Sequence, residues 1–406
     1  MAELMKSSGM TRRGFIRTVG LSGAAAASLG LPGGLDAQAP AGAPSANMPL
    51  RKLGRTGAEV SILCLGGMFD TINNQLLLRQ ALNWGITYWD TAEGYGNGLS
   101  EEGFGRFFTR YPETRRSIFL VTKFRPSPPD MMSEALDKGL KRLCTDYVDT
   151  FLAHGISDFG QIGGIREWAG QMKKSGKIRF FGFSTHSNME ECLLAAARSS
   201  WIDAVMFTYN FRLMNTPKMK EAVEACAQAG IGLTSFKTQA GGPVTADSEA
   251  EFRLLQKFLE RGFTDKQAKL KAVWENPHIA SICSQMPNLT ILSANVAAAR
   301  DKTKLAREDF DSLHQFALET RGDYCAGCGH ICQAAVGGAV PVNEVMRCLM
   351  YHRYYGEPEL ARETFAGLPE AVRQRLTAVD YSRAEQACPQ RLAIAQLMRQ
   401  AAEMLA

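Results

Sequence analysis

The clearest pattern along the chain is an alternation of short apolar runs with amphipathic stretches, beginning near residue 50. Runs rich in β-branched and aromatic residues predict strands at 61–67, 86–91, 117–124, 147–155, 177–185, 203–210, 231–238 and 279–286. Helical patterns lie between them, such as 133–143 and 219–230, the latter ending on Gly230, a natural helix stop. Buried strands that are each followed by a helix predict a (β/α)₈ barrel. A doubly wound open sheet is the alternative, but no G-x-G-x-x-G run follows the first strand.

Both ends of the chain depart from this alternation. Residues 1–45 hold a basic stretch, an apolar run rich in Gly and Ala, and a linker rich in Pro, Ala and Ser. Residues 303–406 show helical patterns. We therefore predict a leader over 1–45, a barrel over 46–302 and an all-helical domain over 303–406. A chain of 406 residues has room for one large and one smaller domain.

Composition argues against two classes of binding partner. Hydrophobic residues make up 45% of the chain and charged residues 21%, which is ordinary for a globular protein. The formal net charge of +5 includes no dense Lys/Arg run, so no nucleic-acid partner is expected. No internal apolar run reaches the ~18 residues that a membrane span needs.

Four polar residues fall at or just after the predicted strand ends, where barrels of this kind carry their chemistry. Asp90 ends the second strand, Tyr95 follows in the loop, Lys123 lies near the end of the third strand, and His154 ends the fourth. Each alone could be a structural residue; together they suit carbonyl reduction. A tyrosine hydroxyl, with an unperturbed pKa near ~10, can protonate the oxygen if an adjacent ammonium lowers that pKa. The carboxylate would hold the ammonium, and the histidine would orient the carbonyl.

The stretch WDTAEGYGNGLSEEGFG at 89–105 resembles the D-T-A-x-x-Y-G-x-G-x-S-E-x-x-x-G signature of the aldo-keto reductases. The resemblance extends over about 49–300. It implies a barrel that binds NADP(H) in extended form, with Asp90, Tyr95, Lys123 and His154 as catalytic tetrad and a small carbonyl compound as substrate. It also implies a set of cofactor-binding residues: Ser184 and Asn210 at the carboxamide, Phe236 on the nicotinamide face and Asn295 near the adenine.

The chain departs from that family's pattern in its cofactor segments. Thr185 and Thr208 stand where an Asn and a Gln are usual, and the basic residues expected after the eighth strand are replaced at best by Arg300 and Lys302. NADH, or no nicotinamide at all, therefore stays open beside NADP(H).

The helical domain contains a cysteine cluster of the kind that binds metal centres. Cys325, Cys328 and Cys332 lie close together in YCAGCGHIC, and Cys388 precedes Pro389. Soft thiolates from a close trio and a distant Cys-Pro suit a 4Fe–4S cluster. Zinc, disulfides and free thiols are the alternatives. The tail also resembles the ferredoxin-like domain of one aldo-keto reductase branch. That resemblance implies one cluster on these four cysteines, with Cys348 as a less suitable substitute ligand.

The leader resembles a twin-arginine export signal. Thr11-Arg12-Arg13 is followed by Phe15 and Ile16 and then by a weakly apolar run. The resemblance implies that the export machinery is a partner, that the protein crosses the membrane folded and that it resides in the periplasm. An uncleaved signal would instead leave an N-terminal membrane anchor.

Two functions are compatible with these features. The first is an exported oxidoreductase that transfers hydride between NADP(H) and a carbonyl or alcohol, with a cluster that is structural or that serves a redox partner protein. The second is a non-catalytic, or nicotinamide-independent, electron-transfer or partner-binding subunit built on a reductase barrel. The complete tetrad favours the first, and the altered cofactor segments favour the second.

Overall fold

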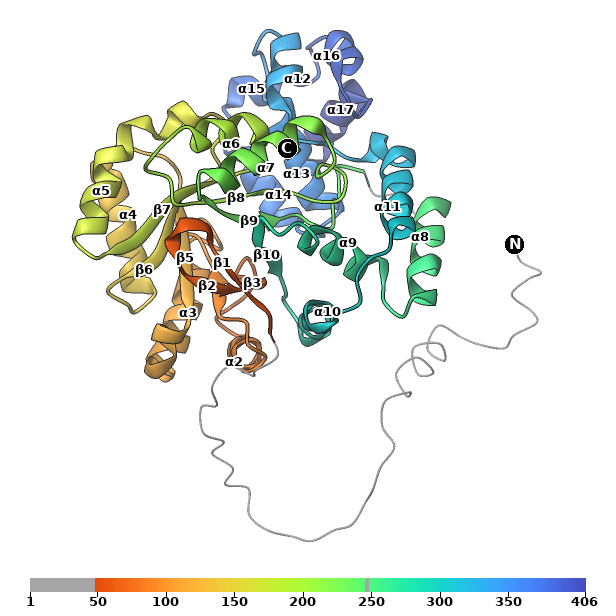
Figure 1. Ribbon diagram of the computed structural model, residues 1–406. Coiled ribbons are helices and arrows are strands. Elements are labelled where there is room, and N and C mark those ends of the chain that lie inside the picture. Colours follow the sequence, from red (N-terminus) through yellow and green to blue (C-terminus); the bar gives the residue numbers. More distant parts are fainter. Residues whose placement is uncertain (1–47, 245–247) are drawn as a thin grey trace. The chain divides into compact units, whose positions relative to one another are not determined.

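The eight predicted strands form a closed parallel barrel in the computed structural model, which describes residues 48–244 and 248–406 (Figure 1). The predicted leader, residues 1–45, lies outside these residues. In barrel order the strands are β10 (Ile279–Gln285), β3 (Leu63–Gly66), β4 (Tyr88–Asp90), β5 (Phe119–Phe124), β6 (Val148–Ala153), β7 (Ile178–Thr185), β8 (Ala204–Thr208) and β9 (Gly232–Phe236). The prediction of a (β/α)₈ barrel is thus confirmed, and the open sheet was the wrong alternative.

Helices follow the strands and form the outer layer. They are α2 (Gln75–Asn83), α3 (Leu99–Arg110), α4 (Pro129–Arg142), α5 (Arg166–Lys174), α6 (Met189–Ala197), α7 (Pro217–Gln228), α8 (Glu249–Glu260), α9 (Asp265–Trp274), α10 (Leu289–Arg300) and α11 (Arg307–Glu319). The sequence of helix α7 explains where this helix begins and ends. Thr216 caps its start by accepting from the Met219 amide, Pro217 occupies the first turn, and the chain leaves through Gly230 at φ 71°.

A short antiparallel hairpin, β1 (Leu50–Lys52) and β2 (Glu59–Ser61), closes the end of the barrel where the strands begin. Leu53, from the turn of this hairpin, is fully buried and packs against Gly232 at the start of β9. The opposite end, where the strands finish, is therefore the end that can hold a site.

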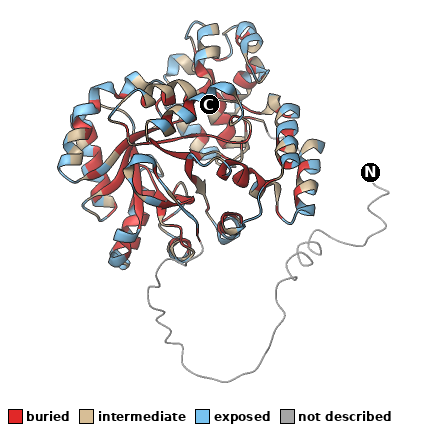
Figure 2. Ribbon diagram, viewed as in Figure 1, coloured by how far each residue is buried: buried red, intermediate tan, exposed pale blue. Residues whose placement is uncertain are grey.

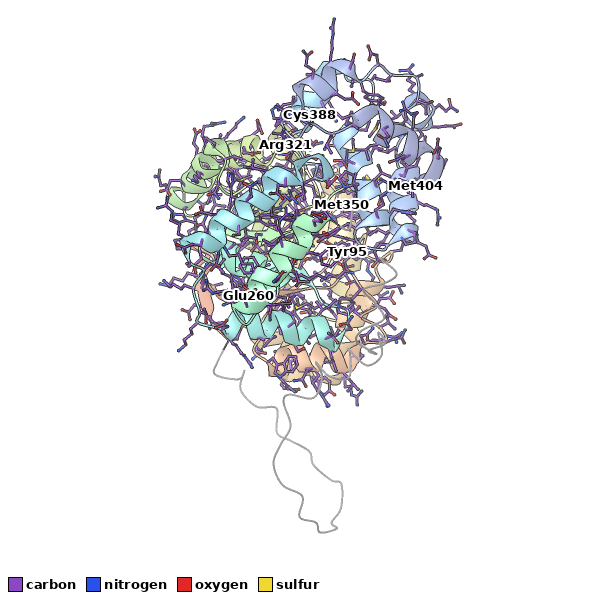
Figure 3. All side chains as sticks on the ribbon, turned by 90° about the vertical axis from the view of Figure 1, so that its right-hand side faces the viewer. Tyr95, Glu260, Arg321, Met350, Cys388 and Met404 are labelled. Carbon is purple, nitrogen blue, oxygen red and sulfur yellow. The ribbon has the colours of Figure 1, made fainter. Side chains whose placement is uncertain are left out.

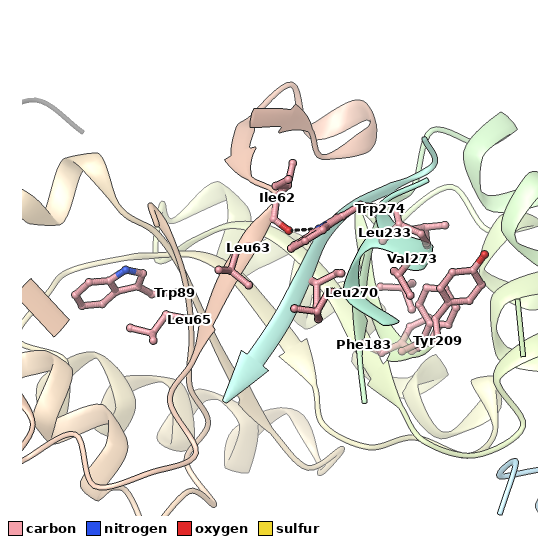
Figure 4. Packing of buried hydrophobic residues seen from close by; sticks show 14 of the residues in the cluster. Ile62, Leu63, Leu65, Trp89, Phe183, Tyr209, Leu233, Leu270, Val273 and Trp274 are labelled. Atoms are coloured by element: carbon pink, nitrogen blue, oxygen red, sulfur yellow. Dashed lines mark hydrogen bonds between the residues drawn. The ribbon is translucent and has the colours of Figure 1, made fainter. Parts of the chain in front are cut away.

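Strand periodicity sorts side chains between the barrel interior and the helix layer. Cys64, Tyr88, Val121 and Met206 pack in the interior cluster. Their strand neighbours join the outer cluster beneath the helices: Leu63, Leu65, Trp89, Leu120, Val205 and Phe207. Figure 2 shows the buried residues concentrated along the strands and the inward faces of the helices. Figure 4 shows part of the outer cluster, where Trp274 donates from Nε1 to the Ile62 carbonyl at 2.8 Å.

The C-terminal segment is helical, as predicted, and has a core of its own. It contains α12 (Gly329–Ala335), α13 (Val342–Arg353), α14 (Pro358–Ala366), α15 (Glu370–Arg375), α16 (Ser382–Ala387) and α17 (Ile394–Leu405). Leu349, Phe365 and Met398 are buried within it. Its likeness to ferredoxin stays a prediction. None of the helices within the described ranges is long and apolar enough to cross a membrane.

Candidate active site

The predicted tetrad lies on the inner face of the barrel at its open end. Asp90 is two residues beyond Tyr88, and Lys123 is two beyond Val121, so both side chains share the orientation of those interior residues. His154 stands in the same phase as Leu152 on β6. The alternation of side chains along three neighbouring strands therefore directs all three groups to one place.

Lys123 organises the site through three short contacts. Its Nζ lies 2.7 Å from Asp90 Oδ2, 2.8 Å from the Thr91 carbonyl and 3.2 Å from the Tyr95 hydroxyl. An ammonium has three protons to donate, and each of these contacts uses one. Lys123 is only 2% exposed, so water does not compete for these positions. The predicted association of Asp90, Lys123 and Tyr95 is present in the structure.

The loop that carries Tyr95 explains much of the sequence signature. Residues 96–98 all have left-handed backbones, with φ of 58°, 52° and 91°, which glycine adopts most readily at 96 and 98. The next residues anchor the loop: Ser100 Oγ donates to the Gly67 carbonyl at 2.6 Å, and Glu101 accepts from Thr122 Oγ1 at 2.6 Å. The signature residues 100 and 101 thus hold the tyrosine in place, a role that the search for catalytic groups missed.

Burial and the neighbouring charges together set the protonation of Tyr95 and Lys123. Burial raises the pKa of Tyr95 above its ordinary value, and the Lys123 ammonium opposes that shift without overcoming it. The predicted lowering by the ammonium is therefore present, but burial, which the sequence analysis did not consider, outweighs it. Burial would lower the pKa of Lys123, but Asp90 and Tyr95 outweigh it and raise that pKa. At neutral pH the site holds a neutral phenol beside an ammonium.

His154 lies edge-on to Tyr95, with ring centroids 5.8 Å apart. Burial lowers its pKa well below the usual range, and the charges of Lys123 and Arg347 add to this effect. The imidazole is therefore neutral at pH 7 and can donate one N–H hydrogen bond to a carbonyl oxygen beside the Tyr95 hydroxyl.

Three of the four predicted cofactor-binding residues gather at the ends of adjacent strands. Ser184 Oγ, at the end of β7, accepts from the Gly155 amide at 2.9 Å. Asn210, after β8, donates from Nδ2 to the Lys237 carbonyl at 3.2 Å. Phe236 ends β9, and its ring packs on His186 with centroids 4.5 Å apart. Asn295 lies on α10, where it donates to Ser284 Oγ at 3.0 Å.

Tyr324 is a site residue that sequence reasoning missed. Its hydroxyl accepts from Asn210 Nδ2 at 2.9 Å, although the two residues lie far apart in the chain. The side-chain oxygen Oδ1 of Asn210 meanwhile accepts from the Arg212 amide at 3.0 Å. The C-terminal segment thus contacts one of the predicted nicotinamide-binding residues. No local sequence signal indicates such a contact.

The four predicted cluster cysteines line one small apolar cavity of about 20 Å³ between α12, α13 and the segment after α16. All ten cysteines are free thiols. Burial raises the pKa of Cys328 to about 12, with neighbouring cysteines adding to the shift. Cys348 is buried in the helical core and is not among the residues that line this cavity. Within the described residues, no group of three or more His, Cys, Asp or Glu side chains could hold a single metal ion.

The sequence model of the Aldo/keto reductase family matches residues 65–319, well over half of the chain. The protein belongs to this family.

Individual relatives are distant. Aldo-keto reductase yakc [NADP(+)] of Schizosaccharomyces pombe is 30% identical over 218 residues, which cover 49% of this chain and 63% of the relative. Uncharacterized oxidoreductase YrpG of Bacillus subtilis is 29% identical over 215 residues, covering 47% of this chain and 66% of that protein. The chain thus spans less than two thirds of the length of these relatives.

Solved structures show the same fold. A thermostable aldo-keto reductase in complex with the inhibitor epalrestat is 26% identical, with a TM-score of 0.55, over 66% of this chain and 100% of the other. The holo form of aldo-keto reductase AKR11C1 from Bacillus halodurans is 23% identical, with a TM-score of 0.57, over 66% and 96%. These matches leave about a third of this chain uncovered.

Replacing Asp90 by Asn tests the buried ion pair. Asp90→Asn leaves the Lys123 ammonium without a carboxylate, so we expect a loss of about 3–5 kcal/mol in the free energy of unfolding, measured with urea. Asp137→Asn, which removes the exposed pair with Lys177, should cost less than about 1 kcal/mol. Adding Lys123→Met to Asp90→Asn should restore part of the stability. Equal costs for the two single variants would contradict this picture of the pair.

Proposed function

We propose that the protein is an NADP(H)-dependent oxidoreductase that interconverts a carbonyl compound and its alcohol. The observation that carries this proposal is the buried contact series Asp90–Lys123–Tyr95, with neutral His154 beside the tyrosine. The name of the yeast relative, which includes NADP(+), supports the choice of cofactor.

The residues around the strand ends fit a nicotinamide. Ser184 Oγ accepts one hydrogen bond and still has its proton to donate. The side-chain oxygen Oδ1 of Asn210 accepts one hydrogen bond and has a second lone pair. Both can therefore bind a carboxamide. Phe236 is half-buried at the end of β9 and offers an aromatic surface. When bound, the cofactor supplies or accepts the hydride.

The side chains of the chain itself manage the proton. His154 and the Tyr95 hydroxyl orient the carbonyl oxygen, and Tyr95 gives its proton to that oxygen as the carbon gains hydride. The phenolate that results lies 3.2 Å from Lys123 Nζ, whose positive charge stabilises it. Asp90 keeps the ammonium in position throughout. Alcohol oxidation runs through the same steps in reverse.

Removing the Tyr95 hydroxyl should abolish most turnover without disturbing cofactor binding. We expect Tyr95→Phe to lower kcat for NADPH-dependent reduction of an aromatic aldehyde by about 10²–10⁴-fold, since it removes the general acid. Tyr111→Phe, on the outer layer next to Phe107, is the matched control and should keep full activity. A Tyr95→Phe enzyme with wild-type turnover would contradict the assignment of Tyr95 as the general acid.

One observation favours the alternative function, a nicotinamide-independent electron-transfer or partner-binding subunit. Tyr324 already binds the Asn210 amide, which reduces the hydrogen bonds left for a nicotinamide. A wild-type protein that neither copurifies with a nicotinamide nor binds NADPH saturably would favour the nicotinamide-independent subunit.

We propose further that Cys325, Cys328, Cys332 and Cys388 bind one 4Fe–4S cluster. The cavity supports it: four thiols from two distant segments meet in apolar surroundings, which is the ligand chemistry of such clusters. A redox partner protein would exchange electrons with a cluster at this position.

Anaerobic purification tests the cluster. We expect about four irons and matching acid-labile sulfide per chain, together with broad visible absorbance. Cys388→Ser should lose most of this iron, whereas Cys144→Ser, which changes an exposed thiol outside the cavity, should keep it. A colourless wild-type protein loaded with zinc would overturn the proposal.

We also propose that the leader directs export of the folded protein to the periplasm through the twin-arginine machinery. The motif around Arg12 and Arg13 supports this proposal. Replacing both arginines by lysine should retain the protein in the cytoplasm, while Arg17→Lys should still be exported, as measured by cell fractionation. Equal distribution of the two variants would contradict the proposal.

A further inference from the structure

Helix α13 of the C-terminal segment covers part of the open end of the barrel. Glu344 accepts from Ser187 Oγ at 3.0 Å, just beyond the end of β7. At the other end of the helix, Arg353 Nη1 donates to the Pro243 carbonyl at 3.0 Å, in the segment after β9. In the view of Figure 3, Met350 of α13 lies between Tyr95 and Cys388. The face of α13 that meets the barrel can therefore contribute to the site.

Lys237 is a half-buried lysine at this junction that the proposed reaction does not use. It follows Phe236 directly, with a left-handed backbone at φ 54°. Its Nζ lies 5.2 Å from the centre of the Tyr351 ring on α13. Among the residues that the structure describes, no carboxylate forms an ion pair with Lys237. Burial and the charge of Arg347 both lower its pKa well below the ordinary value. A bound anion would favour the ammonium form of Lys237 and oppose this shift.

Two further donors at the junction have free nitrogens. Arg347 pairs with Glu344 through Nη2, but its buried Nε has no hydrogen-bond partner within the described part of the chain. His186, whose ring packs on Phe236, has a buried Nδ1 that is likewise unpartnered there. Glu344 is an acidic group at this junction, and its carboxylate is engaged by Ser187, Asn343 and Arg347.

These donors lie together and near the tetrad. Arg347 and Tyr351 are one turn apart on the same face of α13, and Lys237 lies over the Tyr351 ring. His186 and Lys237 flank Phe236. Gly155, the residue after His154, donates its amide to Ser184 Oγ, two residues before His186. The cationic groups therefore stand beside the position where a carbonyl would meet Tyr95.

We propose that Lys237, Arg347 and His186 bind an anionic group of the substrate, so that the preferred substrates are carbonyl compounds carrying a carboxylate or phosphate. The observation behind this is the convergence of two unpartnered buried nitrogens, Arg347 Nε and His186 Nδ1, with Lys237, which has no carboxylate partner among the described residues. The inference rests on the proposed oxidoreductase function. It makes the C-terminal segment a source of specificity, because Arg347 comes from it.

A matched pair of probes tests the charge requirement. We would measure kcat/KM for 4-carboxybenzaldehyde and for 4-formylbenzamide, which has nearly the same shape and no charge. The wild-type protein should prefer the carboxylate, and Lys237→Met and Arg347→Met should each lower that preference about tenfold or more, as expected for loss of a charged hydrogen bond. Arg362→Met, an exposed arginine of α14, is the control and should keep the preference. Thermal unfolding of each variant checks that it is folded.

Two measurements separate this inference from neighbouring explanations. If Lys237→Met weakens NADPH binding and leaves the carboxylate preference intact, the donors serve the cofactor diphosphate and the inference is wrong. If the wild-type protein reduces neither aldehyde, calorimetric binding of 4-carboxybenzaldehyde tests whether the anion site exists without the proposed enzymatic activity. Binding that Lys237→Met and Arg347→Met weaken would keep the anion site while the proposed function fails. Equal binding of the charged and neutral probes would overturn the anion site.

Discussion

The charge of Lys123 is the constraint on which the open end of this barrel depends. A buried ammonium is tolerated only if each of its protons has an acceptor, and here Asp90, the Thr91 carbonyl and the Tyr95 hydroxyl supply them. Meeting this requirement fixes the ends of β4 and β5 and draws the 91–101 loop inward. The same contacts leave a neutral phenol next to a positive charge, which is the arrangement that proton transfer to a carbonyl needs.

The C-terminal helices connect two sites that the sequence suggested separately. Helix α13 faces the open end of the barrel through Arg347 and Tyr351, and Val342 and Met346 of the same helix line the cysteine cavity. Tyr324 binds Asn210, and the next residue is Cys325. One short segment therefore contacts a predicted cofactor-binding residue and also supplies one of the thiols that line the cysteine cavity.

Periodicity was enough to predict the barrel and the place of three of the four candidate catalytic groups. The phase that places Tyr88 and Val121 inside also places Asp90 and Lys123 there. Tyr95 was singled out from its place just after a strand, but its contact with Lys123 could not be predicted in this way, because it lies in a loop whose path depends on left-handed residues at 96–98. The contacts of Tyr324, Lys237 and Arg347 could not be predicted, because they depend on how the C-terminal segment packs on the barrel. The net shift in the pKa of Tyr95 was also missed, because it is set by burial as well as by Lys123.

We propose that hydride reaches a carbonyl carbon at this site while Tyr95 supplies the proton. Reduction of an aldehyde with NADPH deuterated at C4 of the nicotinamide, on either face in turn, tests it most directly. We predict that one of the two labelled cofactors places deuterium on the former carbonyl carbon of the alcohol, and that Tyr95→Phe suppresses this transfer. An alcohol product free of deuterium with both cofactors would contradict the claim.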